Sequence, residues 1–266
     1  MKVNFQEILA TYTDEKRASE KEEFWTYYVI RPLSWHPAWW FVNAGISANK
    51  VTVISIVFVL ISAVLLTTGN LTAALWGAAS LFVWGVLDCA DGTVARFKKK
   101  TNHQGKYLGE FLDAAGAYAV YALILPALGL YAVQPHLGLF NFNTDNYLIH
   151  LFLSSTQNDT PLLLITLLSM AYWSAVSSLA SRLLYQKYKT LKHGEFLEIK
   201  RGEASFGLKK MLVTLSQNII SATNLFLPLM IVALITSNVI PYLFVYALLN
   251  TAMLFFTTLK IVKDLK

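Results

Sequence analysis

Six long apolar runs alternate with short polar segments along the 266-residue chain. Each run has about the 18 or more residues that a helix needs to cross the hydrocarbon core of a bilayer. A backbone inside a membrane must satisfy its own hydrogen bonds, so such runs are expected to be helical. The pattern therefore predicts an all-α integral membrane protein with six transmembrane helices. The predicted spans are residues 51–68, 71–87, 109–133, 161–185, 211–236 and 239–259.

The segment before the first span has a different pattern. Residues 1–21 are charged and are expected to form a mobile or helical tail, whereas residues 24–41 mix tryptophan, tyrosine and phenylalanine with polar residues. Amphipathic aromatic side chains favour the headgroup layer, which predicts one or two interfacial helices on the cytoplasmic face, with Pro32 and Pro37 as breaks. Ordinary packing of these aromatic residues against the bundle is the alternative.

The predicted organisation is therefore a cytoplasmic tail with an interfacial amphipathic segment at residues 1–42, followed by a six-helix membrane domain at residues 43–266.

The distribution of charge predicts how this domain is oriented in the membrane. The connecting segments 69–70, 134–160 and 237–238 contain none of the 22 Lys and Arg residues. Because Lys and Arg are enriched in cytoplasmic loops, both termini are predicted to lie in the cytoplasm.

Composition agrees with a membrane protein and limits its partners. Hydrophobic residues make up 55% of the chain and charged residues 14%, whereas about a quarter of the residues of a soluble domain are charged. The formal net charge of +6 reflects topology and attraction to anionic membrane lipids, so nucleic acid is not expected as a partner. Cys89 is the single cysteine, which excludes an intrachain disulfide and a cysteine-based zinc site.

Three aspartates at the cytoplasmic ends of predicted spans carry the candidate chemistry. Asp88 and Asp91 are three residues apart and share one helical face, and Asp113 lies one turn into the next span. Two carboxylates near a helix C-terminus repel each other and the helix dipole, and a bound cation resolves both conflicts. Oxygen ligands with open positions suit Mg²⁺ or Mn²⁺, so these three residues are predicted metal ligands.

Two neighbouring residues favour a phosphate group beside the metal. Gly92 leaves room for a phosphate to approach the backbone, and Arg96 can pair with phosphate oxygens in a bidentate way. Together with the aspartates, these residues are typical of a metal–pyrophosphate clamp. The alternative is that the acids merely pair with Arg96 and the neighbouring lysines at the membrane interface.

The pattern Asp-x-x-Asp-Gly-x-x-Ala-Arg, followed by Gly-x-x-x-Asp, resembles the signature of the CDP-alcohol phosphotransferase family. An earlier stretch resembles the family's Pro-Asn-x-x-Thr pattern before its first helix, with Ala48 in place of the proline. The resemblance covers roughly residues 23–133, and the predicted helix count also fits the family. The matching residues are Asn49, Thr52, Asp88, Asp91, Gly92, Ala95, Arg96, Gly109 and Asp113.

The resemblance implies an enzyme of phospholipid synthesis. Such an enzyme moves a substituted phosphate to an alcohol and releases CMP. In the usual form the group is phosphatidyl from CDP-diacylglycerol, in a related form the donor is a CDP-linked polar alcohol and the acceptor a lipid alcohol, and the sequence does not separate the two. One of its two substrates is a lipid, its metal is Mg²⁺ or Mn²⁺, its site opens to the cytoplasm, and it is expected to form a homodimer. The resemblance implies that the three aspartates are ligands of this metal ion. It assigns substrate binding to Asn49, Thr52, Gly92, Ala95, Arg96 and Gly109.

Two departures from the family pattern concern the proton acceptor. The loop before Gly109 is longer than usual, and Ala117 stands where the family has a fourth aspartate, usually assigned as a metal ligand and as the base for the acceptor hydroxyl. In a shifted register, Asp113 is itself that fourth aspartate. Alternatively, Glu110 supplies the missing oxygen, or His103 in the loop accepts the proton. Asp113 and Glu110 are the catalytic residues expected here.

The second half of the chain offers two further sets of polar residues. A basic set at the end of the fourth span either contacts a phosphorylated acceptor or is only a topology signal. A polar set in the fifth span either lines a cavity or holds helices together. The basic set is Arg182, Lys187, Lys189 and Lys192, and the polar set is Gln217, Asn218, Ser221, Thr223 and Asn224.

Two other functional classes compete with the transferase. Ala117 favours a family-derived protein that has lost the chemistry and binds metal or nucleotide, or acts as a membrane scaffold. A transporter or channel is disfavoured, because the acidic residues cluster at the predicted cytoplasmic rim and not at the middle of the membrane.

Overall fold

The computed structural model describes residues 3–99, 106–133, 160–193, 214–215 and 218–265. These residues form helices and connecting turns, with no strand among them. The elements are α1 (Phe5–Leu9), α2 (Asp14–Glu20), the π-helix η1 (Thr26–Ile30), α3 (Arg31–Asn43), α4 (Ala48–Thr67), α5 (Leu71–Lys99), α6 (Lys106–Val133), α8 (Thr160–His193), α10 (Phe226–Ile235) and α11 (Val239–Leu265).

Five of the described helices, α4, α5, α6, α8 and α11, are long and apolar enough to cross a membrane. This finding confirms the all-helical fold and is consistent with an integral multi-pass membrane protein. The remaining predicted span, residues 211–236, lies partly outside the described residues. Its described end contains α10, whose 10 residues are fewer than the roughly 18 that span a bilayer, so the count of six stays a prediction.

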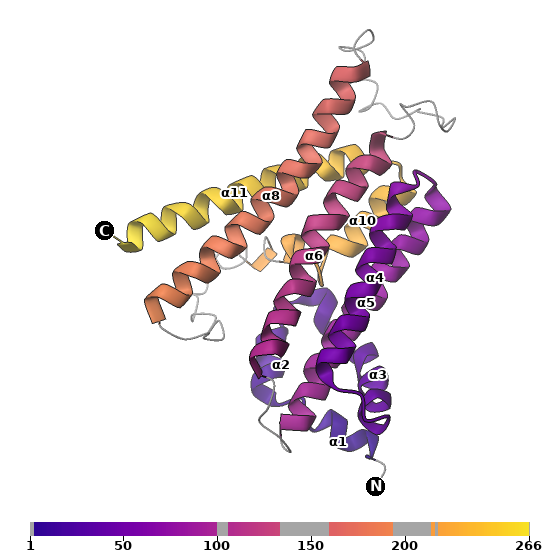
Figure 1. Ribbon diagram of the computed structural model, residues 1–266, viewed down its shortest axis with the longest axis vertical. Helices are drawn as coiled ribbons and strands as arrows, with labels where there is room; N and C mark the ends of the chain where they lie inside the picture. Colours follow the sequence, from indigo (N-terminus) through magenta and orange to yellow (C-terminus); the bar gives the residue numbers. More distant parts are fainter. Residues whose placement is uncertain (1–2, 100–105, 134–159, 194–213, 216–217, 266) are drawn as a thin grey trace.

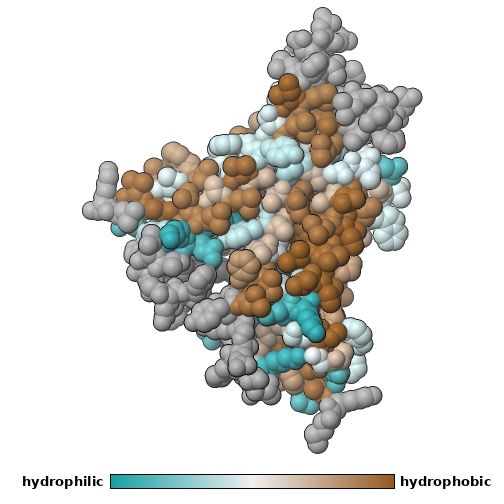
Figure 2. All heavy atoms as spheres, in the orientation of Figure 1, coloured by the Kyte–Doolittle hydropathy of each residue, from teal (hydrophilic) through white to brown (hydrophobic). Residues whose placement is uncertain are grey.

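The long helices form two packed groups. Helix α4 packs against both α5 and α6, and these three lie side by side in Figure 1. Helices α8 and α11 pair with each other, and α8 also packs against α6. A broad brown area covers the long helices in Figure 2, and exposed Val57, Leu60, Val64 and Trp76 belong to α4 and α5. Such an extended apolar surface fits contact with lipid.

Small and polar residues set the helix contacts within these groups. A Cβ atom placed on Gly129 of α6 would lie 2.5 Å from the Cβ of Ala171 on α8, so the glycine allows these two helices to approach closely. Between α11 and α8, the Asn250 side chain donates a hydrogen bond to the Ser174 hydroxyl at 3.0 Å. A close approach at a glycine and a hydrogen bond between two side chains thus join neighbouring helices.

The N-terminal helices pack against one end of the bundle (Figure 1). Ile8 of α1 is completely buried in a cluster with Val51 of α4 and Ala90 of α5, so the predicted tail is helical and packed. The chain is also helical through both predicted breaks, because Pro32 lies in the first turn of α3, where its missing N–H is tolerated, and Pro37 lies within α3. The position of this segment in the headgroup layer stays a prediction.

The chain turns just before α10. Residues 218–220 are helical and residues 221–225 form the turn, whereas the neighbouring Gln217 lies outside the described residues. Three tyrosine hydroxyls donate hydrogen bonds to backbone carbonyls around this turn, which replaces bonds that an unbroken helix would make. The pairs are Tyr246 with Ile219 at 2.5 Å, Tyr121 with Ile220 at 2.9 Å, and Tyr242 with Phe226 at 3.0 Å.

Two asparagines of this region hold the N-terminal segment. The Asn218 side chain accepts a hydrogen bond from the Phe24 N–H at 2.9 Å and donates one to the Glu22 carbonyl at 2.7 Å. The Asn224 side chain accepts one from the Thr26 N–H at 3.0 Å. Of the two roles considered for the polar set of the fifth span, these members therefore hold segments together.

Candidate metal centre

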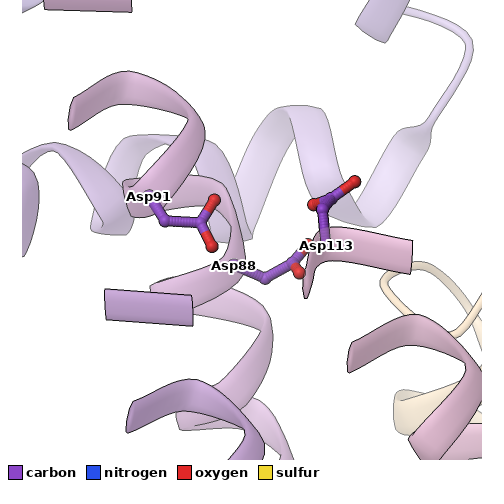
Figure 3. Close-up of side chains that lie close together, drawn as sticks. All are labelled: Asp88, Asp91 and Asp113. Atoms are coloured by element: carbon purple, nitrogen blue, oxygen red, sulfur yellow. The ribbon is translucent and has the colours of Figure 1, made fainter. Parts of the chain in front are cut away.

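Three carboxylates from two helices lie close together (Figure 3). Asp88 and Asp91 lie on α5 and Asp113 lies on α6. Each offers one carboxylate oxygen, and these oxygens lie within 4.8 Å of one another. Asp91 is buried, Asp88 is half-buried and Asp113 is exposed, so the group is open on the side of Asp113. The proximity expected from the sequence is therefore present.

The position of this group along α5 differs from the sequence-based expectation. Helix α5 does not end near Leu87 but continues to Lys99, so Asp88 and Asp91 lie inside the helix. Because the dipole effect is confined to the last turn, repulsion by the helix C-terminus is weaker than expected. Repulsion between the carboxylates remains, since they lie within a few ångströms of one another.

The geometry fits a hard divalent cation. Oxygen ligands of Mg²⁺ lie about 2.1 Å from the ion, so ligands on opposite sides are roughly 4 Å apart. Oxygens within 4.8 Å of one another need only small side-chain rotations to reach one ion. Three protein oxygens leave the other coordination positions for water or phosphate oxygens, and Mn²⁺ accepts the same ligand types.

The first turns of α4 connect the two helices that carry the aspartates. The buried Thr52 hydroxyl donates a hydrogen bond to the Asp91 carboxylate at 2.5 Å. One turn earlier, the Asn49 side-chain oxygen would lie 3.2 Å from a Cβ atom placed on Gly109 of α6. Both α4 residues were predicted to contact substrate. Thr52 is hydrogen-bonded to Asp91, and Asn49 lies over the glycine at the start of α6, so contact with substrate stays a prediction for both.

Arg96 lies beside Gly92, one turn beyond the aspartates of α5. A Cβ atom on Gly92 would lie 3.4 Å from the Arg96 Nη1, and Nη2 donates a hydrogen bond to the Thr93 hydroxyl at 3.0 Å. The Nε atom is buried and has no hydrogen-bond partner among the described residues, and Arg96 makes none of the ion pairs found there. A guanidinium in this condition is suited to an anionic ligand.

A family model for CDP-alcohol phosphatidyltransferase matches residues 45–193, more than half of the chain. The chain belongs to the CDP-alcohol phosphatidyltransferase family. This confirms the resemblance found in the sequence. The family transfers head groups in phospholipid synthesis, uses a CDP-linked donor and an alcohol acceptor, and typically depends on a divalent metal. No curated protein matches the chain.

Two charged residues of the centre were missed by the sequence analysis, and both precede the region matched to the CDP-alcohol phosphatidyltransferase family. The Arg31 Nε donates a hydrogen bond to Glu20 at 2.8 Å, and its Nη2 contacts the second Glu20 oxygen. The Arg31 Nη1 donates to the Cys89 carbonyl on α5 at 2.8 Å. Arg31 and Glu20 are 5% and 4% exposed, and charged side chains are rarely so buried unless they are paired.

This ion pair sets the protonation of Glu20. Burial by itself raises the pKa of this carboxyl group, but the hydrogen bonds and the positive charge of Arg31 outweigh burial and hold the pKa below its ordinary value. Glu20 is therefore charged at neutral pH. In the sequence, Arg31 is distinguished only by its position within an aromatic segment, and this does not identify Glu20 as its partner.

The structure describes only some of the other residues that were predicted to belong to the site. The backbone of Glu110 lies in α6, one turn before Asp113, but its side chain is outside the described part. His103 lies outside the described residues. Arg182 is engaged within the bundle, where its Nη2 donates a hydrogen bond to the Tyr121 hydroxyl at 2.7 Å. Lys187 is exposed, and the side chains of Lys189 and Lys192 are outside the described part.

Proposed function

We propose that this chain transfers a phosphatidyl group from CDP-diacylglycerol to an alcohol and releases CMP, with Mg²⁺ or Mn²⁺ held by Asp88, Asp91 and Asp113. The observation that carries the proposal is the group of three carboxylate oxygens within 4.8 Å. When bound there, the ion supplies positive charge that orients the pyrophosphate of the donor and stabilises the leaving CMP.

The reaction exchanges one phosphorus–oxygen bond for another. The acceptor hydroxyl oxygen bonds to the phosphorus that carries the lipid. The bond from this phosphorus to the bridging oxygen breaks, and CMP leaves with that oxygen and the electron pair. The hydroxyl proton passes to a base. We assign this role to Asp113, the exposed carboxylate of the three, or to Glu110 one turn before it on α6.

The neighbouring residues position the donor. Arg96 presents a buried N–H without a hydrogen-bond partner, which suits a phosphate oxygen of the pyrophosphate. Gly92 and Ala95 keep side-chain bulk away from the α5 surface around Arg96. Asn49 lies against Gly109, and we assign to it the binding of the nucleotide part of the donor. Thr52 acts on the site through its hydrogen bond to Asp91, beside the proposed nucleotide position.

We further assign the orientation and assembly of the protein. The absence of Lys and Arg from residues 69–70, 134–160 and 237–238 supports cytoplasmic termini and a site that faces the cytoplasm. Exposed Tyr28 and Trp40 support an interfacial position for the segment between α2 and α4. A homodimer is proposed from family resemblance alone.

The decisive experiment measures CMP release by the full-length protein in lipid nanodiscs. CDP-diacylglycerol and CDP-linked polar alcohols are supplied separately, each with a panel of acceptors and with Mg²⁺ or Mn²⁺. We expect metal-dependent CMP release from CDP-diacylglycerol that Asp91→Ala abolishes. Release from a CDP-linked polar alcohol alone would contradict the proposed donor. Release that persists in Asp91→Ala would contradict the proposed metal site.

Ala117 supports a second candidate function, a family member that binds metal or nucleotide without turnover. Ala117 lies one turn after Asp113 on α6 and provides a methyl group where the family has a carboxylate. This candidate predicts that the wild-type protein binds Mn²⁺ and CDP-diacylglycerol but releases no CMP, and that Ala117→Asp restores release. If the wild-type protein turns over and Ala117→Asp does not increase the rate, the second candidate is wrong.

A further inference from the structure

The N-terminal segment contacts α5 between the two aspartates of that helix. The Arg31 Nη1 donates a hydrogen bond at 2.8 Å to the Cys89 carbonyl, which lies between Asp88 and Asp91 in the chain. The same nitrogen lies 3.5 Å from the Thr93 hydroxyl, one turn further along α5. A side chain from outside the matched family region therefore reaches the backbone that carries two of the three proposed metal ligands.

Thr93 extends this contact to the proposed phosphate-binding arginine. The Thr93 hydroxyl, 2% exposed, donates to the Cys89 carbonyl at 3.1 Å and accepts a hydrogen bond from Arg96 at 3.0 Å. A continuous series of hydrogen bonds thus runs from Glu20 through Arg31 to Arg96. Threonine bonds of this kind, back to the carbonyl one turn earlier, often bend a helix, and here a second donor fixes the same carbonyl.

The charge of Arg31 is balanced within the N-terminal segment. Both of its carboxylate contacts are to Glu20, on α2. A lone buried guanidinium beside the aspartates would compete with a divalent cation, and breaking a buried pair leaves such an uncompensated charge. The pair therefore gives α5 hydrogen-bond donors without adding a net charge next to the metal centre.

The backbone that leads to Arg31 is also held by the turn before α10. Arg31 follows the π-helix η1 directly, and π turns occur frequently at functional positions. Thr26, at the start of η1, donates its N–H to the Asn224 side chain at 3.0 Å and its hydroxyl to the Thr223 carbonyl at 3.0 Å. The backbone that leads into Arg31 is thus anchored by residues 223 and 224 as well as by the packing of α3 on α5.

We propose that Arg31 is a positioning residue of the metal centre, which fixes the part of α5 that carries Asp88, Asp91 and Arg96. Its effect on metal binding and catalysis rests on the proposed function, whereas its effect on the order of α5 does not. Replacing a residue that hydrogen-bonds to the ligands of a metal centre typically lowers metal affinity or activity by about 10- to 100-fold.

Arg31→Lys tests this role in full-length protein in nanodiscs. Lysine keeps the positive charge but lacks the planar fork that bonds to Glu20 and Cys89 at once. Three quantities are measured: amide hydrogen exchange of α5 without metal, Mn²⁺ binding by electron paramagnetic resonance, and kcat and half-saturating Mn²⁺ for CMP release. We expect faster exchange around residues 88–96, about tenfold weaker Mn²⁺ binding, and a shift in half-saturating Mn²⁺ larger than the change in kcat.

Asn250→Ala is the matched control for general destabilisation. Asn250 is 1% exposed and bonds to Ser174 between α11 and α8. We expect this variant to lower the unfolding temperature without changing Mn²⁺ binding or exchange in α5. If both variants change these two quantities equally, Arg31 is not a positioning residue. If the wild-type protein binds no Mn²⁺, the proposed function is wrong, and the exchange of α5 alone decides whether Arg31 orders this helix.

Discussion

The Thr52 hydroxyl on α4 donates a hydrogen bond at 2.5 Å to the carboxylate of Asp91 on α5, 39 residues later in the chain. A hydroxyl has a single proton, so the Ala48 carbonyl at 3.1 Å competes with Asp91 for the same bond. An ionised carboxylate is a stronger acceptor than a backbone carbonyl, and the bond to Asp91 is the shorter of the two. Thr52 therefore orients the one buried aspartate of the candidate metal centre.

Thr52→Val removes this hydroxyl with little change of shape. We expect half-saturating Mn²⁺ for CMP release to rise by about tenfold, because Asp91 loses the partner that orients it. The free energy of unfolding should fall by about 1–3 kcal/mol, the cost of leaving a buried acceptor without its donor. Thr52→Ser keeps the hydroxyl and serves as the control. Equal Mn²⁺ dependence in the valine variant and the wild type would rule out an orienting role.

Gly129→Ala is expected to disturb the contact of α6 with α8. The added methyl group would lie 2.5 Å from the Ala171 Cβ, so one helix must move. Overpacking of this kind costs about 1–3 kcal/mol, which denaturation in mild detergent measures. Mn²⁺ binding should not change, because Gly129 lies roughly 24 Å along α6 from Asp113 at 1.5 Å per residue.

The exchanged pair Gly129→Ala with Ala171→Gly is the control for this prediction. It returns a single methyl group to the crossing and keeps one glycine and one alanine in these helices, so the helix propensities cancel. The double variant should recover most of the lost stability. A double variant as unstable as Gly129→Ala would show that crowding at this crossing is not the cause.

The pair of Glu20 and Arg31 predicts how stability depends on pH. Arg31 lowers the pKa of Glu20 in the folded protein below 4.5, the ordinary value, so the unfolded chain takes up the proton first as pH falls. The stabilisation is complete above about pH 4.5 and is lost as pH falls through the lowered pKa. Thermal unfolding between pH 3 and 7 measures this loss.

Glu20→Gln cannot titrate and is the control. It should be less stable at neutral pH by about 3–5 kcal/mol, because Arg31 is left buried without its counter-charge. Its unfolding temperature should also fall less steeply between pH 5 and 3 than that of the wild type. Parallel curves for the two proteins would show that Glu20 does not account for the acid sensitivity.

Asn224→Ala is expected to loosen the N-terminal segment. The change leaves the buried N–H of Thr26 without an acceptor, at a cost of about 1–3 kcal/mol. Limited proteolysis should cut the variant near residues 22–26 faster than the wild type. Asn70→Ala, an exposed change at the start of α5, should leave this rate unchanged. Equal cleavage in both variants would mean that Asn224 does not hold the segment.

The helices were predicted well where hydrophobicity alone decides them. The first predicted span, residues 51–68, differs by three residues or fewer from Ala48–Thr67, because a membrane core demands a sustained apolar run. The predicted end of the second span was wrong by three turns. The apolar run stops at Leu87, but Ala90 and Val94 are buried against the N-terminal helices, and this tertiary partner carries the helix on to Lys99.

Some residues of the candidate site could be predicted from local sequence, and others could not. Asp88 and Asp91 were predictable because their spacing places them on one turn of a single helix. Arg31 was not, because its partners are 11 and 58 residues away and are brought together only by the fold. The polar character of Asn218 and Asn224 was visible in the sequence, but their partner segment was not, since nothing local connects residue 24 with residue 218.

The hydrogen bonds of Asn218 and Asn224 to the N-terminal segment can form only late during synthesis. They join residues 194 and 198 positions apart, so the groups at Phe24 and Thr26 leave the ribosome long before Asn218 and Asn224 exist. Contacts so distant in sequence form late in folding. The segment that carries Arg31 therefore gains its anchor only when most of the chain has been made, and a nascent chain that stops before residue 218 lacks it.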